Sequence, residues 1–454
     1  MTDARGRGAR PGAARRAARR SGTGVLVGAA LLAVVALTHA VPPRDAYIDL
    51  YMDGLVVTPT GTATLSPGAA QAYLGRTRVP SPTASDSPEQ RDALVSLAAE
   101  QTAWLASGSV PGDGTELAHL AEGALLDLRA MLRHDGAMVA AVHPRWAYAW
   151  PRDNSFAAVA FARTGHVAEA LSVLDFLDRV QAPDGSFEAR YTLDAPGAPD
   201  DRPAQTDGTG WALWSLGQVV GAEAPDGPGA RDVAVRFRGM LDRSTARALR
   251  LIDTPSGLPP VSPDYWEVSE TRLTLGTAAP LLAGLEAAAD VYAVLDAPDD
   301  AARADAGAAR LRAAIERTFG ARGYPRHVSG GSRDAATAFL LPPFTSAPPS
   351  GAVDAWRASV RDMARPAGGL APGGSWKSDG ISWTPQTSLY ALAAAEQGDA
   401  ATALSWLRWI DEHRTASGAI PEKVLADGSP AAVAPLAWSC ANVLLALDAL
   451  DRLG

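Results

Sequence analysis

The chain has 454 residues, of which 47% are hydrophobic and 20% charged, enough for one large globular domain or two to three smaller ones. Residues 1–40 carry a net charge of +6 and the whole chain −9, which leaves −15 on the remainder and excludes nucleic acid as a favourable partner. Cys440 is the only cysteine, which excludes an intramolecular disulfide, and the seven histidines lack the spacing of zinc ligands, which excludes a Cys/His metal site.

The first 40 residues have the pattern of an export signal. The basic stretch "RRAARR" precedes a short apolar run from Val25 to Leu37, and Ala40 is a small residue before a possible cleavage point. An apolar run of about 13 residues suits a signal peptide better than a membrane span, which needs about 20. We expect an exported protein in which residues 1–40 are either a cleaved signal peptide or a signal anchor. An anchor would tether the protein to the outer face of the cytoplasmic membrane.

Residues 41–87 differ in composition from the rest of the chain. They are rich in Pro, Thr, Ser and Gly and contain one plausible extended piece, "AYIDLYMDGLVV", so we expect a linker or a short ordered collar. From Ser87 onward apolar residues recur at helical spacing, and Pro88 stands just inside the first helix start. We therefore assign residues 88–454 to a single catalytic domain.

This domain is predicted to be all-α, with about twelve helices and hardly any β-alternation. Such a chain fits either an α-solenoid or a closed toroid of paired helices. No repeat of about 30–45 residues carries a recurring signature, which disfavours the solenoid. The predicted helices lie near residues 87–106, 115–134, 153–164, 166–181, 208–221, 229–253, 271–296, 300–319, 350–365, 385–397, 399–413 and 435–452.

Tryptophan and charged residues occur together in the long loops. In a toroid, loops from alternate helix ends converge on one face and can line a pocket. Sugar rings have an apolar face and a polar rim, so their sites combine aromatic platforms with hydrogen-bonding charges. Five tryptophans have such neighbours: Trp150, Trp266, Trp376, Trp383 and Trp438.

Two glutamates in these loops suit proton transfer. Glu267 directly follows Trp266, and a carboxyl group desolvated against an indole has a raised pKa and can donate a proton near neutral pH. Glu270 lies three residues further on and competes for the same role. Glu422 stands beside Lys423 ahead of a turn, and is either a solvated loop residue or a base.

A further charged pair lies in "YAWPRD", at the start of a predicted helix. Asp153 either caps this helix, or together with Arg152 it receives a ligand. The sequence pattern alone leaves both interpretations open.

These motifs, in this order, resemble glycoside hydrolase family 15, the glucoamylases and glucodextranases with related bacterial trehalases. The resemblance covers about residues 115–452. "YAWPRD" is similar to the family's Trp-x-Arg-Asp motif, which grips the non-reducing-end sugar. "DYWE" looks like the general-acid motif and "GAIPEKV" like the general-base block, which implies Glu267 as acid and Glu422 as base. With the aromatic loops, the expected substrate-binding residues are Trp150, Arg152, Asp153, Arg202, Gln205, Asp207, Trp266, Lys377, Trp383 and Trp438.

The resemblance also implies a fold and a reaction. The fold is an (α/α)6 toroid of six inner and six outer helices. The reaction is exo-acting, inverting hydrolysis that releases glucose from the non-reducing ends of α-glucans or oligosaccharides, without a metal or organic cofactor. The two carboxyl groups of an inverting pair stand about 6.5–9.5 Å apart.

The chain departs from the family pattern at three places. Lys423 stands where the family often has Gln, and Lys377 is the only cation where the loop before "SWTPQTS" usually carries an arginine. The N-terminal β-domain of many bacterial members has no counterpart in residues 41–87. Linkage specificity, substrate length and oligomeric state therefore stay open.

Two other functions fit the same fold. One is a non-catalytic carbohydrate-binding toroid, and the other is a glycoside phosphorylase in which phosphate replaces the attacking water. A terpene cyclase is disfavoured because the sequence has no Asp-x-Asp-Asp cluster.

Overall fold

The structure is a computed structural model that describes residues 46–453 except for residues 70, 195–196 and 223–228. The predicted signal peptide or anchor, residues 1–40, lies outside these described residues. Within them the chain is mainly helical, as predicted, with thirteen α-helices, two short 3-10 helices and five short strands. No helix in this part of the chain is long and apolar enough to cross a membrane.

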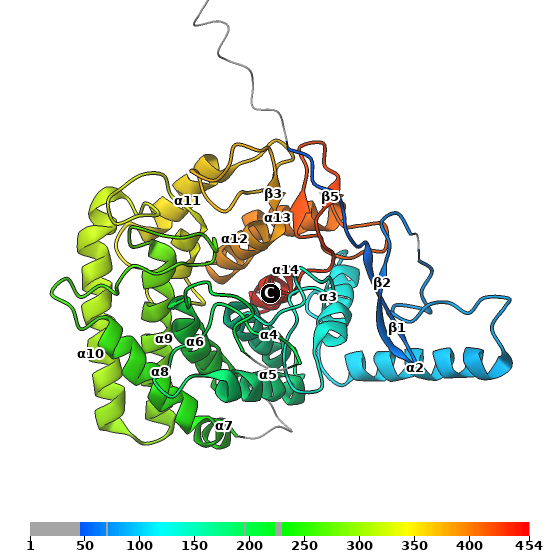
Figure 1. Ribbon diagram of the computed structural model, residues 1–454, viewed down its shortest axis with the longest axis horizontal. Coiled ribbons are helices and arrows are strands. Elements are labelled where there is room, and N and C mark those ends of the chain that lie inside the picture. Colours follow the sequence, from blue (N-terminus) through cyan, green and yellow to red (C-terminus); the bar gives the residue numbers. More distant parts are fainter. Residues whose placement is uncertain (1–45, 70, 195–196, 223–228, 454) are drawn as a thin grey trace, which may run out of the picture. The chain divides into compact units, whose positions relative to one another are not determined.

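Six helical elements form the inner ring of a toroid. Each packs against the next, and the last returns to the first (Figure 1). Most of their side chains are buried around the whole circumference, as expected for helices covered on every side. In ring order they are α4 (Pro151–Arg163), α6 (Asp207–Val220), α9 (Leu275–Val294), η2 (Ala335–Leu340), α12 (Thr384–Glu396) and α14 (Ala437–Asp451).

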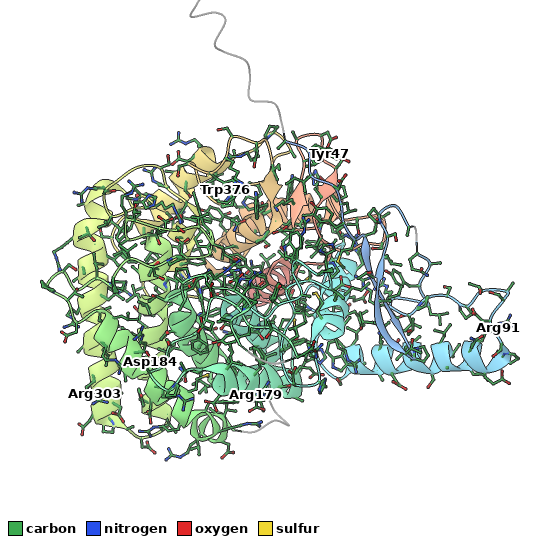
Figure 2. All side chains as sticks on the ribbon, in the orientation of Figure 1. Tyr47, Arg91, Arg179, Asp184, Arg303 and Trp376 are labelled. Carbon is green, nitrogen blue, oxygen red and sulfur yellow. The ribbon has the colours of Figure 1, made fainter. Side chains whose placement is uncertain are left out.

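Six outer helices cover this ring. They are amphipathic: in α11 the buried residues Ala352, Ala355, Trp356, Ser359 and Met363 recur at helical spacing along one stripe. Charged side chains cover the opposite faces (Figure 2). The outer helices are α3 (Ala118–Met131) on α14, α5 (Val167–Val180) on α4, α8 (Arg238–Leu251) on α6, α10 (Pro298–Thr318) on α9, α11 (Ala352–Met363) on η2 and α13 (Ala400–Glu412) on α12.

The twelve predicted helices are not the twelve members of the toroid. The first, α2 (Pro88–Ala106), exists with a Ser87 capping box but extends away from the ring (Figure 1). The inner element η2 was not predicted, because six residues of 3-10 helix carry no readable period. The helix predicted over 229–253 is interrupted at Phe237, between α7 (Ala230–Arg236) and α8. The remaining short 3-10 helix is η1 (Gly320–Arg322).

The inner helices α6 and α9 approach each other backbone to backbone. A Cβ atom on Gly210 would lie 2.2 Å from the carbonyl oxygen of Pro280, and one on Gly284 would lie 2.7 Å from that of Gly210. Only glycine fits at these two positions, so they set the spacing of this part of the ring.

Residues 46–69 and 71–87 pack on the toroid as a collar. Strand β1 (Gly54–Thr58) pairs antiparallel with β2 (Gly61–Leu65). Next to β1, the buried Asp53 carboxylate accepts a hydrogen bond from the Ser417 N–H at 2.8 Å, and the Tyr51 N–H donates to the Ala432 carbonyl at 2.6 Å. The collar thus holds the C-terminal loop that carries Glu422.

A buried ion pair fixes the collar to α3. Arg78 donates from Nε and Nη2 to the two carboxylate oxygens of Asp127, at 2.5 and 2.7 Å, and both residues are buried. Nearby, Arg76 forms an exposed ion pair of 2.9 Å with Glu122.

We expect Asp127→Asn to lower the free energy of unfolding by about 3 kcal/mol or more, because it leaves the Arg78 guanidinium buried without a counter-charge. The matched variant Glu122→Gln removes the neighbouring exposed pair and should cost less than about 1 kcal/mol. Urea unfolding of both variants measures the difference. Equal losses of unfolding free energy in the two variants would show that the buried pair does not hold the collar.

Candidate active site

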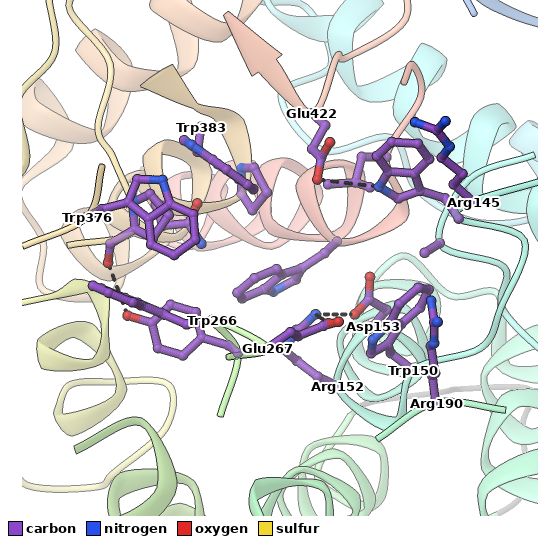
Figure 3. Close-up of a pocket in the computed structure, with 18 of the residues that line it drawn as sticks. Arg145, Trp150, Arg152, Asp153, Arg190, Trp266, Glu267, Trp376, Trp383 and Glu422 are labelled. Carbon is purple, nitrogen blue, oxygen red and sulfur yellow. Dashed lines mark hydrogen bonds and ion pairs between the residues drawn. The ribbon is translucent and has the colours of Figure 1, made fainter. Parts of the chain in front are cut away.

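A cavity of about 250 Å³ opens at the N-terminal ends of the inner helices (Figure 3). Nine of the twelve expected site residues line it; four of them are loop tryptophans, and the fifth loop tryptophan, Trp376, lines it as well. Its wall consists of Ala140, Arg145, Trp146, Trp150, Arg152, Asp153, Arg190, Arg202, Tyr265, Trp266, Glu267, Pro372, Trp376, Trp383, Pro385, Gln386, Glu422, Leu436 and Trp438.

The start of α4 contributes a buried charged pair. Arg152 Nη2 donates to Asp153 Oδ2 at 2.9 Å, and the guanidinium lies over the ring of Trp438 at 4.3 Å. Asp153 is not the N-cap residue, which is Trp150, but it stands in the first turn, where its carboxyl group accepts a backbone N–H and also lies on the pocket wall. Burial raises the pKa of this carboxyl group, and the adjacent Arg152 opposes the rise.

Glu267 forms part of the same wall and has an unusual backbone. Its φ of 55° lies in the left-handed region, which costs a non-glycine residue free energy and occurs often at functional sites. One carboxylate oxygen accepts a hydrogen bond from Arg202 Nη1 at 2.9 Å, and Arg152 Nη2 lies 3.8 Å from the other. Burial raises the pKa of Glu267, against the opposing effect of these arginines. The sequence predicted the desolvation but not the arginine contacts.

Glu422 enters the pocket from the wall opposite Glu267 (Figure 3). Its carboxylate lies 3.1 Å from Lys423 Nζ and accepts a hydrogen bond from Trp146 Nε1 at 3.4 Å. Glu422 is 8% exposed, so the solvated-loop interpretation is wrong. Strand β3 (Ser382–Trp383) pairs with β4 (Lys423–Val424), which pairs with β5 (Pro430–Ala431), and this sheet brings the Lys423 ammonium within 4.2 Å of the Trp383 ring centroid.

Thr384 is the first residue of α12 (Thr384–Glu396), whose cap residue is Trp383. The Thr384 hydroxyl donates to the carbonyl of Pro421 and lies 2.8 Å from Ser439 Oγ. It therefore fixes the loop just before Glu422 to the inner ring.

Three expected site residues do not line the pocket. Asp207 is buried at the start of α6, where its carboxylate accepts a hydrogen bond from Trp211 Nε1 at 3.2 Å. Gln205 is buried just before the same helix. Lys377 is exposed, with its ammonium 5.5 Å from the Trp376 ring centroid, so it does not replace the family's arginine at the pocket wall.

The sequence-based prediction omitted several residues of the wall. Trp376 carried the same signal as the other loop tryptophans and could have been included. The guanidinium of Arg190 stacks on Tyr148 at 4.0 Å, a contact that arises from the long 181–206 loop and has no local sequence signal. The other omitted polar and aromatic residues are Arg145, Trp146, Tyr265 and Gln386, and the omitted apolar ones are Ala140, Pro372, Pro385 and Leu436.

The pocket wall holds buried polar atoms without a hydrogen-bond partner among the described residues. Most are donors, and five belong to tryptophan rings. A ring of indole N–H groups and guanidinium edges is suited to a neutral ligand rich in hydroxyl groups. These atoms include Trp150 Nε1, Arg152 Nε and Nη1, Arg190 Nε, Trp266 Nε1, Trp376 Nε1, Trp383 Nε1, Gln386 Oε1 and Trp438 Nε1.

Comparison with known proteins identifies the family. No family model matches the chain. The isomaltose glucohydrolase of Kribbella flavida is 30% identical over 387 residues, which span 75% of this chain and 96% of that protein. The chain belongs to glycoside hydrolase family 15. It is therefore a glycoside hydrolase, and the resemblance inferred from the sequence motifs is confirmed.

Solved structures agree with this family 15 assignment. A glycosidase variant in complex with glucose aligns with a TM-score of 0.61 at 25% identity, covering 72% of this chain and 95% of that one. A bacterial glucoamylase complexed with acarbose aligns with a TM-score of 0.63 at 16% identity, over 81% of this chain and 62% of that one. The Saccharomycopsis fibuligera glucoamylase aligns with a TM-score of 0.55 at 14% identity, covering 70% of this chain and 89% of that one. The two glucoamylases show the shared toroidal fold.

The pKa of Asp207 gives a testable pH dependence. Burial raises this pKa to about 7, although Arg152 opposes the rise. Because the folded-state pKa exceeds the unfolded value, the contribution of Asp207 to stability is complete below about pH 4 and is lost as the pH rises to about 7. Asp207→Asn cannot titrate, so the stability of the variant relative to the wild type should rise between pH 4 and 7, by at most about 1.4 kcal/mol per pH unit, and level off above. Unfolding midpoints at pH 5, 6, 7 and 8 measure this; parallel curves for the two proteins would contradict it.

Proposed function

We propose that this protein is an exo-acting, inverting glycoside hydrolase that releases glucose from the non-reducing ends of α-glucosides, with Glu267 as general acid and Glu422 as general base. The observation that carries the proposal is the placement of these two carboxyl groups on opposite walls of one tryptophan-lined pocket (Figure 3). Opposite faces are what inversion requires, because the water must attack the sugar on the side away from the leaving group.

In the proposed reaction, protonated Glu267 donates its proton to the glycosidic oxygen as the bond to the anomeric carbon breaks. Ionised Glu422 takes a proton from the attacking water, and the new bond forms with inverted configuration. The step leaves Glu267 ionised and Glu422 protonated, and exchange with solvent restores both. Arg202 and Arg152 lie within 2.9 and 3.8 Å of the Glu267 carboxylate and stabilise the charge that appears there.

The start of α4 is the proposed site for the departing glucose unit. Asp153 and Arg152 present an acceptor and donors at its floor, and Trp438 and Trp150 present ring faces and indole N–H groups. Sugar hydroxyl groups would satisfy these polar atoms, while the apolar face of the ring packs on an indole.

The relative's name suggests the linkage. An isomaltose glucohydrolase acts on an α-1,6-linked disaccharide, and the small pocket fits a short substrate better than the middle of a polymer. We therefore propose isomaltose and related short α-1,6-glucosides as substrates. The basic and apolar residues 1–40 support the further proposal that the protein acts outside the cytoplasm, either secreted or anchored.

Proton NMR of the sugar first released tests the reaction. With isomaltose, maltose, trehalose and dextran as substrates, we expect prompt β-glucose, with isomaltose the best substrate. Prompt α-glucose would contradict inversion. A requirement for added phosphate, with glucose 1-phosphate as product, would identify a phosphorylase instead.

The carboxyl groups are tested separately. We expect Glu422→Gln and Glu267→Gln to lower kcat on isomaltose by about 10²–10⁴-fold each, because each removes one proton transfer. Glu396→Gln is the matched control, since Glu396 pairs with Arg452 at 2.7 Å and does not line the pocket. Wild-type rates in either pocket variant would remove that glutamate from the mechanism.

A further inference from the structure

A fully buried arginine lies directly behind the wall that carries Glu267. Arg326 Nη2 donates to Asp264 Oδ1 at 2.8 Å and to Glu270 Oε1 at 2.6 Å, and Nη1 donates to Asp334 Oδ2 at 2.7 Å. The side chains of Arg326, Asp264 and Asp334 are at most 1% exposed, and that of Glu270 is 8% exposed. Asp264 and Glu270 lie close to Glu267 in the sequence, but no local sequence pattern connects Arg326 or Asp334 with the pocket.

The contacts close a loop around Glu267. Asp264 lies three residues before it and Glu270 three residues after it, and both carboxylates bind the same guanidinium nitrogen. The segment 264–270 is thus tied at both ends, with Glu267 at its centre. These contacts also distinguish the two glutamates that were candidates for the general acid. Glu270 does not line the pocket and instead binds Arg326.

The middle of the loop is fixed to the same group. The Arg326 guanidinium lies 3.6 Å from the ring centroid of Trp266. Asp264 accepts the Trp266 N–H at Oδ1 and the Glu267 N–H at its carbonyl, at 3.0 and 2.8 Å. These bonds hold Glu267 at its positive φ of 55°, a conformation that persists only where the surroundings enforce it.

The charges of this cluster point to a geometric role. One guanidinium faces three carboxylates, and His327 Nε2 lies 3.0 Å from the second oxygen of Glu270. Taking so many charges out of water offsets most of their attraction, so an apolar core of the same volume would be at least as stable. What an arginine provides that an apolar core cannot is a planar set of donors that binds several carboxylates in fixed directions.

We propose that Arg326 is a positioning residue for the general acid: by closing the 264–270 loop it aims the Glu267 carboxyl group at the glycosidic oxygen. The inference rests on the proposed function of Glu267. A general acid must lie within hydrogen-bond reach of the leaving oxygen, and a misplacement of about 1 Å can cost about 100-fold in rate.

The leaving group distinguishes positioning from general stability. Isomaltose loses an alkoxide that must be protonated as it departs. α-Glucosyl fluoride loses fluoride, which departs without a proton from the acid. A loosened Glu267 therefore slows isomaltose hydrolysis selectively, whereas a loss of folded protein slows both reactions alike.

The test variants change Glu270, because replacing Arg326 would leave three buried carboxylates without a counter-charge. Glu270→Ala cuts one end of the tie while Asp264 and Asp334 still hold Arg326. We expect kcat/KM on isomaltose to fall by about 10- to 100-fold, and kcat/KM on α-glucosyl fluoride to stay within about twofold. Glu270→Gln, whose amide oxygen can still accept from Arg326, should recover most of the isomaltose activity. Glu396→Ala, which removes a surface ion pair, should leave kcat/KM unchanged on both substrates.

The ratio of the two rates is measured on one sample, so the unfolded fraction cancels. If the Ala variant does not fold, Glu270→Asp takes its place, because it retains the charge and shortens the side chain. We expect it to lower kcat/KM on isomaltose selectively, by less than the Ala variant would. If the Glu270 variants lose kcat/KM equally on isomaltose and on α-glucosyl fluoride, or lose none on either, Arg326 is not a positioning residue for Glu267. Glu267→Gln is run alongside: if it slows the fluoride as much as isomaltose, Glu267 is not the acid, and the proposed function fails whatever the Glu270 variants do.

Discussion

The burial of most side chains of the inner ring is the constraint on which the rest of the structure depends. At Gly210 and Gly284, helices α6 and α9 meet without room for a side chain. At these two glycines there is no room for a ligand between the helices. The tryptophan-lined pocket lies instead at one end of the ring, where the loops before the inner helices converge and backbone N–H groups are free to face a ligand.

The pocket at that end combines two opposing electrostatic effects. Burial favours the protonated form of Glu267, while Arg202 and Arg152 favour the ionised form. Burial thus helps the acid to hold its proton before the reaction, and the arginines stabilise the charge that appears when the proton is given up. On the opposite wall, Glu422 has one ammonium neighbour, Lys423, at a position where the family often has an uncharged amide.

The sequence predicted the parts of the structure that rest on local patterns. The Ser87–Pro88 helix start and the loop tryptophans followed from capping, periodicity and the pairing of aromatic with charged residues. Element η2 was missed because a six-residue 3-10 helix has no period to detect. Lys377 was misplaced because proximity in sequence to Trp376 says nothing about which way the side chain turns. The signal or anchor prediction stays a prediction, since residues 1–40 lie outside the described part of the chain.

The contacts that no local pattern could reveal join residues far apart in the chain. The contact between Asp264 and Arg326 is one, and the hydrogen bonds between the collar and the base-bearing loop, from Asp53 to Ser417 and from Tyr51 to Ala432, are others. Because Asp53 and Ser417 are separated by 364 positions, the ribosome must synthesise everything between them before these hydrogen bonds can form. A nascent chain that stops before Glu422 would have most of its helices but neither the base nor the contacts that hold its loop, so a working site appears late in synthesis rather than growing with chain length.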